Sequence, residues 1–359
     1  MSLIRLMILS TVLMMSLLSV SPRLLAKAVT ETDGPYVFID PSSQATAYWI
    51  CNNQLKTTLV INQQLKQPQH CGQLPQPKLS TVIKQRMPDT YTGVKKVVAL
   101  SDVHGQFDVL LTLLKQHQII DAEGNWSFSD GHMVMTGDIF DRGHQVNEVL
   151  WFMYKLDQQA RETGGMVHLL MGNHEQMVLS GDLRYVHQRY DISTTLINRR
   201  YDKLYGIDSE IGQWLRSKNT IIKINDVLYM HGGISNEWIT RKLTLAKANT
   251  LYRQHIDTPK AELKANDLLN FLFFGNGPTW YRGYFDDAFT EAQLDPILNY
   301  FNVNHIVIGH TSQKQVRGLF NNKVIAIDSS IKNGQSGELL LIENKTLTRG
   351  LYNGQQKQL

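Results

Sequence analysis

The chain has 359 residues, of which 42% are apolar, and its formal net charge at neutral pH is +4. This length and composition are those of a globular protein with ample material for a core. Lys and Arg are scattered rather than clustered, so the sequence carries no footprint of nucleic acid binding. The small positive excess would still favour anionic substrates near a site.

The N-terminal residues are typical of a targeting signal. Arg5 gives a positive start, residues 6–20 are apolar, and residues 26–28 offer a small-x-small cleavage site. The apolar run is shorter than the ~20 residues of a membrane-spanning helix, so we favour a cleaved signal peptide over residues 1–28 rather than an anchor. We therefore expect a periplasmic or secreted protein that has no membrane attachment after cleavage.

Export implies an oxidising compartment, and the chain has only two cysteines, Cys51 and Cys71. Both lie in one early segment, which favours a single disulfide between them. Two free buried thiols are the alternative.

Short strands and a connector follow the signal. Apolar and polar residues alternate in residues 36–39, 47–50 and 58–61, which predicts a small antiparallel sheet. Residues 67–88 are rich in Pro and Gln and predict a connector. We expect a small N-terminal β domain with its linker over residues 29–90.

The rest of the chain, residues 91–359, alternates strand and helix patterns and is the predicted catalytic domain. Alternating strands and helices predict an α/β architecture. The predicted strands are 97–100, 134–136, 166–171, 227–230, 304–308, 324–328 and 338–343, and the predicted helices lie over 107–117, 145–162 and much of 177–218.

Five of these apolar strands end in residues able to bind a metal. In an α/β fold the carboxyl ends of the strands converge on one crevice. Carboxylates, an Asn carbonyl and neutral imidazoles suit borderline to hard divalent ions. A single histidine is more often a core or surface residue, but five strand ends argue against coincidence. The residues are Asp102 with His104, Asp138, Asn173 with His174, His231 and His310.

The motifs around these residues resemble those of the calcineurin-like metallophosphoesterases. The Asp141-Arg142-Gly143 extension and Glu175 resemble the phosphoprotein-phosphatase branch. Residues 280–284 and the exported two-cysteine segment resemble the Shewanella-like phosphatases. The motifs are Asp102-x-His104-Gly105, Gly137-Asp138-x-x-Asp141-Arg142-Gly143, Gly172-Asn173-His174-Glu175, His231-Gly232-Gly233 and Gly309-His310.

The resemblance implies a β-sandwich flanked by helices and a site for two divalent metal ions, Zn, Mn or Fe. It places Asp102 and His104 on the first metal, and Asn173, His231 and His310 on the second. Asp138 would bridge the two ions. A metal-bridging hydroxide would attack phosphorus directly, and no Cys-x5-Arg signature is present for a covalent route.

The resemblance also implies substrate-handling roles. His174 is expected to be the general acid and Asp141 the carboxylate that orients it. Arg142 and Arg282 are expected to clamp phosphate oxygens, although Arg282 could instead be a surface residue stacked on its aromatic neighbours. Further expected substrate contacts are Asn173 and an apolar rim formed by Ile139, Phe140, Trp280, Tyr281, Tyr284 and Phe285, with core packing as the alternative for this rim.

These assignments predict a monomeric metal-dependent phosphomonoesterase acting on phosphoproteins or phosphopeptides, with phosphotyrosine as the leading substrate. One alternative is a dinucleoside polyphosphate hydrolase, which export argues against because such substrates are cytosolic. The other is a metal-holding binding module without turnover. Retention of His174, Asp141 and Arg142 argues against that module, since binding alone needs no acid.

Overall fold

The computed structural model describes residues 30–359, and Glu31–Leu359 forms one compact unit. The predicted signal peptide over residues 1–28 lies outside the described residues. Within residues 30–359, no helix is both long and apolar enough to cross a bilayer.

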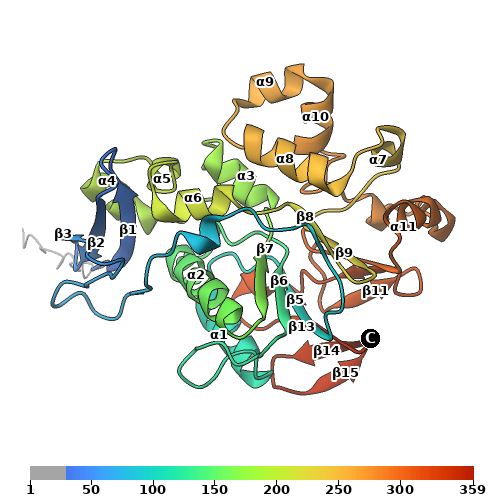
Figure 1. Cartoon of the computed structure of the whole chain (residues 1–359), viewed down its shortest axis with the longest axis horizontal. Helices are drawn as coiled ribbons and strands as arrows, with labels where there is room; N and C mark the ends of the chain where they lie inside the picture. The colour runs from blue at the N-terminus through green and yellow to red at the C-terminus, as the bar shows by residue number, and fades with distance from the viewer. Residues whose placement is uncertain (1–29) are drawn as a thin grey trace, which may run out of the picture. The chain divides into compact units, whose positions relative to one another are not determined.

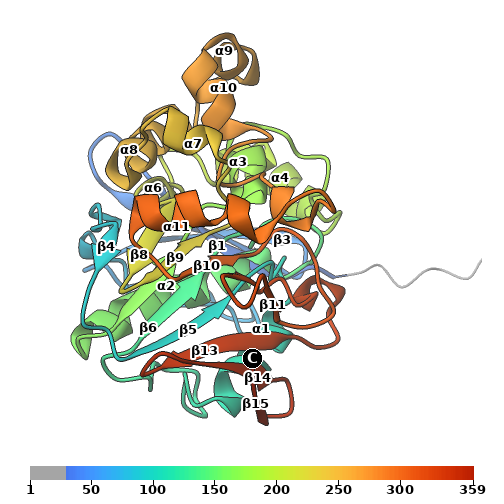
Figure 2. The ribbon, with the colours of Figure 1, turned by 90° about the vertical axis from the view of Figure 1, so that its right-hand side faces the viewer.

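Two six-stranded sheets form a β-sandwich in the described part of the chain (Figures 1 and 2). Their strands are β4 (Thr90–Tyr91), β5 (Lys96–Leu100), β6 (His132–Met135), β7 (Met166–Leu169), β8 (Ile221–Ile224), β9 (Val227–Met230), β10 (His305–Ile308), β11 (Arg317–Leu319), β12 (Val324–Ala326), β13 (Glu338–Glu343), β14 (Thr346–Leu351) and β15 (Gln356–Gln358). One sheet has the order β15-β14-β13-β5-β6-β7, and the other has the order β11-β12-β10-β9-β8-β4. Strands β5, β6 and β7 are parallel, as are β9, β10 and β12.

The period of two along each strand divides the apolar side chains between two cores. In β5, Val97 and Ala99 belong to the cluster between the sheets, while Val98 and Leu100 belong to the larger core beneath the helices. Strand β10 follows the same rule, with Val307 between the sheets. Strands that are buried on both faces therefore read as continuous apolar runs in the sequence.

Helices surround the sandwich. They are α1 (Phe107–Gln116), α2 (Val146–Glu162), α3 (Asn173–Leu179), α4 (Tyr190–Ile197), α5 (Tyr201–Leu204), α6 (Glu210–Arg216), α7 (Glu237–Thr240), α8 (Leu245–His255), α9 (Lys260–Ala265), α10 (Asp267–Phe273) and α11 (Asp295–Phe301). Helix α2 packs against β7, and Figures 1 and 2 both show α7–α10 gathered at one end of the unit.

A third sheet, of three antiparallel strands, precedes the sandwich in the described residues: β1 (Asp33–Ile39), β2 (Ala45–Cys51) and β3 (Gln54–Leu59). It packs on α2, α4 and α6, and the indole N–H of Trp151 in α2 donates to Pro35 O at 2.8 Å. The predicted disulfide is confirmed, since Cys51 at the end of β2 is bonded to Cys71.

The predicted α/β class and the small antiparallel sheet are confirmed, but some boundaries and edge strands were wrong. The third N-terminal strand starts at Gln54 rather than 58, because Asn52 and Asn53 adopt positive φ and make a tight hairpin turn. Strands β4, β8, β11, β14 and β15 were missed. Their sequences are short or lack the apolar runs on which the prediction relied.

Candidate metal centre and active site

The predicted metal-binding side chains meet at the carboxyl ends of the strands. Asp102 follows β5, Asp138 follows β6, and Asn173 opens α3 just after β7. His231 directly follows β9, and His310 lies two residues beyond the end of the neighbouring strand β10. The ends of parallel strands thus bring distant parts of the sequence to one place.

The strand ends turn sharply, which aims these side chains into the site. Left-handed backbone of this kind is uncommon outside glycine and is concentrated at functional sites. Gly172 allows the close approach that follows, because a Cβ there would overlap the carboxylate of Asp138. The site residues with positive φ are Asp102, His104, Asp138, Asp141, Arg142 and His310.

Asp138 lies at the centre of the cluster. Its Oδ2 is 3.2 Å from His231 Nε2 and 3.6 Å from His104 Nε2, and its Oδ1 accepts a hydrogen bond from the backbone N–H of His174 at 3.0 Å. Two groups with metal-ligand spacing share this carboxylate. One contains His104 and His174, and the other contains His231 and His310.

Three imidazoles share an arrangement that is typical of metal ligands. Each donates one ring N–H to a backbone carbonyl: His104 Nδ1 to Phe140 O at 2.6 Å, His231 Nδ1 to Thr136 O at 3.0 Å, and His310 Nε2 to Trp280 O at 3.2 Å. A carbonyl can only accept, so in the neutral imidazole the other ring nitrogen carries the lone pair. Such outer hydrogen bonds fix the tautomer of a metal-binding histidine.

The free ring nitrogens of His231 and His104 face oxygen atoms, which fits bound cations, whereas Nδ1 of His310 lies 3.4 Å from the guanidinium of Arg282. His231 Nε2 lies 2.9 Å from Asn173 Oδ1 as well as beside Asp138, and His104 Nε2 is buried without a hydrogen-bond partner. Without a metal, the lone pair of His231 Nε2 would repel those of the nearby oxygens, so a proton must lie between them. Accordingly, although burial opposes it, Asp138 and Asp102 raise the pKa of His231 to about 9. Divalent ions would take the place of that proton.

Crowded carboxylates give a second reason for cations at this site. Burial, and then the charges of Asp328 and Asp138, raise the pKa of Asp102 to about 8. Asp328 is fully buried beyond β12 and accepts a hydrogen bond from Ser312 Oγ at 2.6 Å. Sequence analysis did not single out Asp328, because it ends its strand without a metallophosphoesterase motif.

Glu175 is a fully buried carboxylate that shapes the loop after β6. Its two oxygens accept the backbone N–H groups of Asp138 at 2.8 Å, Ile139 at 2.7 Å and Gly172 at 2.8 Å. It therefore holds the end of β6 against the start of α3, a role that its place in a motif did not predict.

His174 is held by a second carboxylate on the side away from Asp138. Its Nδ1 lies 2.5 Å from Asp141 Oδ2, and both side chains are buried. Burial opposes the charged imidazolium, but Asp138 and Asp141 outweigh it and raise the pKa of His174 above its ordinary value. The other ring nitrogen, Nε2, is 3.4 Å from the guanidinium of Arg142.

Two exposed arginines flank the cluster. Arg282 donates to His310 O at 2.8 Å and to Thr311 Oγ1 at 2.9 Å, and Arg142 lies beside His174. Tyr185, which the sequence did not suggest, is 46% exposed, with its ring 5.5 Å from that of His174 and 5.7 Å from the guanidinium of Arg142.

The expected apolar rim is only partly present. Trp280 and Tyr281 are half-buried, and the Trp280 ring lies edge-on to His310 at 5.9 Å. The expectation that Ile139 contacts the substrate is corrected, because Ile139 and Phe140 are fully buried in the core. Tyr284 is also buried, and its hydroxyl donates to the backbone of Ile234 at 2.9 Å.

Comparison with known proteins agrees with this geometry. A crystal structure of the cold-active protein-tyrosine phosphatase of a psychrophilic Shewanella species is 75% identical, covers 92% of this chain and 100% of its own, and superposes with a TM-score of 0.91. An uncharacterized protein of Schizosaccharomyces pombe is 31% identical over 72% of this chain and 81% of its own length. Shewanella-like protein phosphatase 1 of Plasmodium berghei is 28% identical over 67% of this chain and 69% of its own. The profile of the calcineurin-like phosphoesterases matches residues 95–314, which is more than half of the chain, and the chain belongs to that family.

Proposed function

We propose that this protein is a dinuclear metallophosphatase that hydrolyses phosphoproteins, with phosphotyrosine as its preferred substrate. The observation that carries the proposal is the position of the His174–Asp141 pair beside Asp138, the carboxylate common to both metal-ligand groups. Asp141 binds Nδ1 of His174, while Nε2 lies 3.4 Å from the guanidinium of Arg142 and 3.9 Å from Asp138. This position between a phosphate-binding cation and the metal ligands suits a proton donor to the leaving group.

The donor set divides between two divalent ions. Asp102 and His104 would hold the first ion, Asn173, His231 and His310 the second, and Asp138 both. When bound, the ions supply Lewis acidity and lower the pKa of water in contact with them. Zn, Mn and Fe all suit these ligands.

His174 also lies within ligand distance of the first group, but we assign it as the proton donor. Its contact with Asp141 favours the imidazolium, which has no lone pair for a metal. The nucleophile is a hydroxide, formed when a water loses one proton to solvent. As its oxygen bonds to phosphorus, the bond to the leaving oxygen breaks, His174 Nε2 gives that oxygen a proton, and the ring then takes a proton back from solvent. Asp141 keeps the ring in place through Nδ1.

Arg142 and Arg282 are assigned to the phosphate oxygens. Both guanidinium groups are exposed at the edge of the cluster and have donors left over. A planar fork suits two oxygens of one phosphoryl group better than an ammonium does. Asn173 at the start of α3 is a further candidate contact.

The aromatic surface supports a tyrosine substrate. Tyr185, Trp280 and Tyr281 all keep exposed ring surface near the cluster. Rings at the mouth of a site can pack against a phosphorylated phenol. The 75% identical relative is itself described as a protein-tyrosine phosphatase.

We also propose that the protein works outside the cytoplasm, as a monomer with a catalytic domain over residues 91–359 and a small β domain with its linker over residues 29–90. The Cys51–Cys71 bond supports an oxidising compartment. The pattern of residues 1–28 supports a cleaved signal peptide.

Rates on three substrates test the proposal. Purified protein should hydrolyse a phosphotyrosine peptide with a higher kcat/KM than the matched phosphoserine peptide, and a dinucleoside tetraphosphate least well. A preference for phosphoserine would contradict the tyrosine assignment. A preference for the dinucleoside tetraphosphate would replace the whole proposal with the polyphosphate hydrolase.

A further inference from the structure

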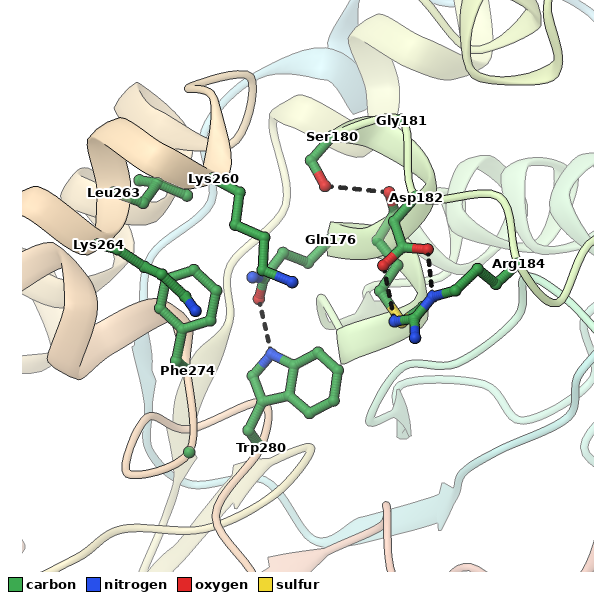
Figure 3. A pocket seen from close by; sticks show the side chains of 12 residues that line it. Gln176, Ser180, Gly181, Asp182, Arg184, Lys260, Leu263, Lys264, Phe274 and Trp280 are labelled. Atoms are coloured by element: carbon green, nitrogen blue, oxygen red, sulfur yellow. Dashed lines mark hydrogen bonds and ion pairs between the residues drawn. The ribbon is translucent and has the colours of Figure 1, made fainter.

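A cavity of about 460 Å³ opens beside the active site, between α3 and the α9–α10 hairpin (Figure 3). Its wall combines cationic, polar and apolar side chains, and no role in the proposed reaction uses it. The residues on which the argument depends are Gln176, Asp182, Arg184, Lys260, Lys264 and Phe274, with Trp280 at the boundary.

The cavity and the active site share a wall. Trp280 lies edge-on to His310 on one side, and its indole N–H donates to Gln176 Oε1 at 3.3 Å on the other. Gln176 belongs to α3, the helix that carries His174. A peptide whose phosphorylated residue occupies the active site would therefore pass the cavity with a neighbouring residue.

The cavity is electropositive. Lys260 and Lys264 stand four residues apart on one face of α9, and Figure 3 shows Lys260 reaching toward Gln176. Neither lysine makes an ion pair within residues 30–359. Asp182 is the acid in the lining. It is paired with Arg184, at 2.7 and 2.8 Å, and the charge of Lys260 also acts on it without a close contact.

These contacts favour a carboxylate over a nucleotide base. The ammonium of Lys264 lies over the Phe274 ring, 5.4 Å from its centre, so a base stacked on that face would have to displace a cation. The indole N–H of Trp280 is satisfied by Gln176. The positive charge of the cavity lies beside apolar surface from Leu263 and Phe274. This combination suits an acidic side chain, whose short aliphatic part ends in a carboxylate.

We propose that this cavity is a specificity subsite that binds an acidic side chain near the phosphorylated residue of a peptide substrate, with Lys260 as its principal cation. The inference rests on the proposed phosphoprotein phosphatase function and adds a sequence preference to it. Recognition of this kind is electrostatic, so the preference should weaken as salt rises.

The test compares kcat/KM for phosphotyrosine peptides that differ by one Glu or Ala, placed in turn at single positions on either side of the phosphotyrosine. At one position the wild type should prefer Glu by roughly threefold to fivefold, the scale of a partly screened ion pair. Lys260→Glu should abolish or invert that ratio. This change places a negative charge in the first turn of α9, where the helix dipole favours it, so folding should be preserved.

Lys247→Glu is the matched control. Lys247 is also an exposed lysine in the first turn of a helix, α8, and it does not line the cavity. It makes the same change in net charge, so it should keep the wild-type ratio. Equal effects of the two variants, or a wild type with no preference for Glu at any position, would overturn the subsite.

Further outcomes show whether the acidic subsite alone or the whole proposed function has failed. If Lys260→Glu weakens hydrolysis of a dinucleoside tetraphosphate but leaves the peptide ratio unchanged, the cavity serves nucleotides and the acidic subsite is refuted. If the wild type hydrolyses no phosphopeptide, the proposed function itself fails and the subsite fails with it. Active hydrolysis of phosphotyrosine peptides without an acidic preference refutes the subsite alone.

Discussion

Asp141 Oδ2 lies 2.5 Å from His174 Nδ1, and this contact leaves Nε2 as the ring nitrogen available to a substrate. The carboxylate fixes the orientation of the ring and favours its protonated form. The same ring faces Asp138 at 3.9 Å through Nε2. The His174 ring therefore lies between Asp141, which orients it, and Asp138, which is common to both metal-ligand groups.

The first prediction concerns the leaving group. A tyrosine phenolate has a conjugate-acid pKa of ~10, far below that of a serine alkoxide, so it depends less on protonation. His174→Asn should therefore lower kcat on a phosphoserine peptide by roughly 10²–10⁴-fold, the range of general acid catalysis, and much less on phosphotyrosine or nitrophenyl phosphate.

Asp141→Asn is the companion variant, because it keeps the imidazole but removes the carboxylate that orients it. Asp141→Asn should also lose more kcat on phosphoserine than on phosphotyrosine, but both losses should be smaller than those of His174→Asn. Equal losses on serine and tyrosine substrates in both variants would show that His174 gives no proton in the rate-limiting step.

The second prediction concerns the shared carboxylate. Asp138→Asn should remove nearly all turnover and lower the metal content measured by elemental analysis, because Asp138 is common to both ligand groups. Chelation of the wild type should have the same effect, and added Zn, Mn or Fe should reverse it in the wild type only. An Asp138→Asn protein with near-normal rates and no metal would contradict a dinuclear mechanism.

The metal-ligand residues could be predicted from the sequence because each ends an apolar strand, and strand ends converge in this architecture. Asp328 also lies at the end of a predicted strand, just beyond β12, but no motif marks it as part of the site. Tyr185 lies in a loop without a motif, and only the folded structure brings its ring beside His174. The predicted substrate contact of Ile139 was wrong because a position in the motif does not fix the direction of a side chain. It follows the strand next to Asp138, but its side chain turns into the core while the backbone binds Glu175.

The third prediction concerns the phosphate clamp. Arg282→Ala should cost about 2–4 kcal/mol of transition-state stabilisation, measured from kcat/KM on a phosphotyrosine peptide, which is the scale of one lost electrostatic contact. Arg282→Lys should recover only part of that loss, because an ammonium cannot reproduce the planar fork. Unchanged kcat/KM in Arg282→Ala would make Arg282 a structural residue that only holds the loop at His310 and Thr311.

The fourth prediction concerns the N-terminal sheet. The Cys51–Cys71 bond closes a loop across 20 residues, which corresponds to a stabilisation of ~3 kcal/mol in the chain-entropy model. Reductant should lower the Tm of the wild type and leave a Cys51→Ser/Cys71→Ser variant unchanged. Two thiols that alkylate in the native protein without reductant would disprove the bond.

The last prediction concerns acid stability and a histidine pair away from the active site. His168 Nε2 lies 3.0 Å from His132 Nδ1 on adjacent strands, and Tyr91 from β4 packs against both rings. Burial lowers the pKa of His132 to about 4, and burial together with His132 lowers that of His168 to about 3. Among the nearby charges, Asp157 opposes the shift of His168, while Lys218 and Arg161 reinforce it.

Both pKa values lie below the ~6.5 of an unfolded histidine, so between those limits the unfolded chain binds protons that the native pair does not. The stability is therefore complete above pH ~6.5 and is lost as the pH falls toward 4, by at most ~1.4 kcal/mol per pH unit for each histidine. The variant His132→Asn/His168→Gln keeps amide groups near the two facing nitrogens but does not titrate. Urea unfolding of both proteins at pH 7, 6 and 5, with chelator present, should show a shallower decline for the variant. Since losses from other groups are common to both proteins, parallel declines would mean that the pair contributes nothing to acid sensitivity.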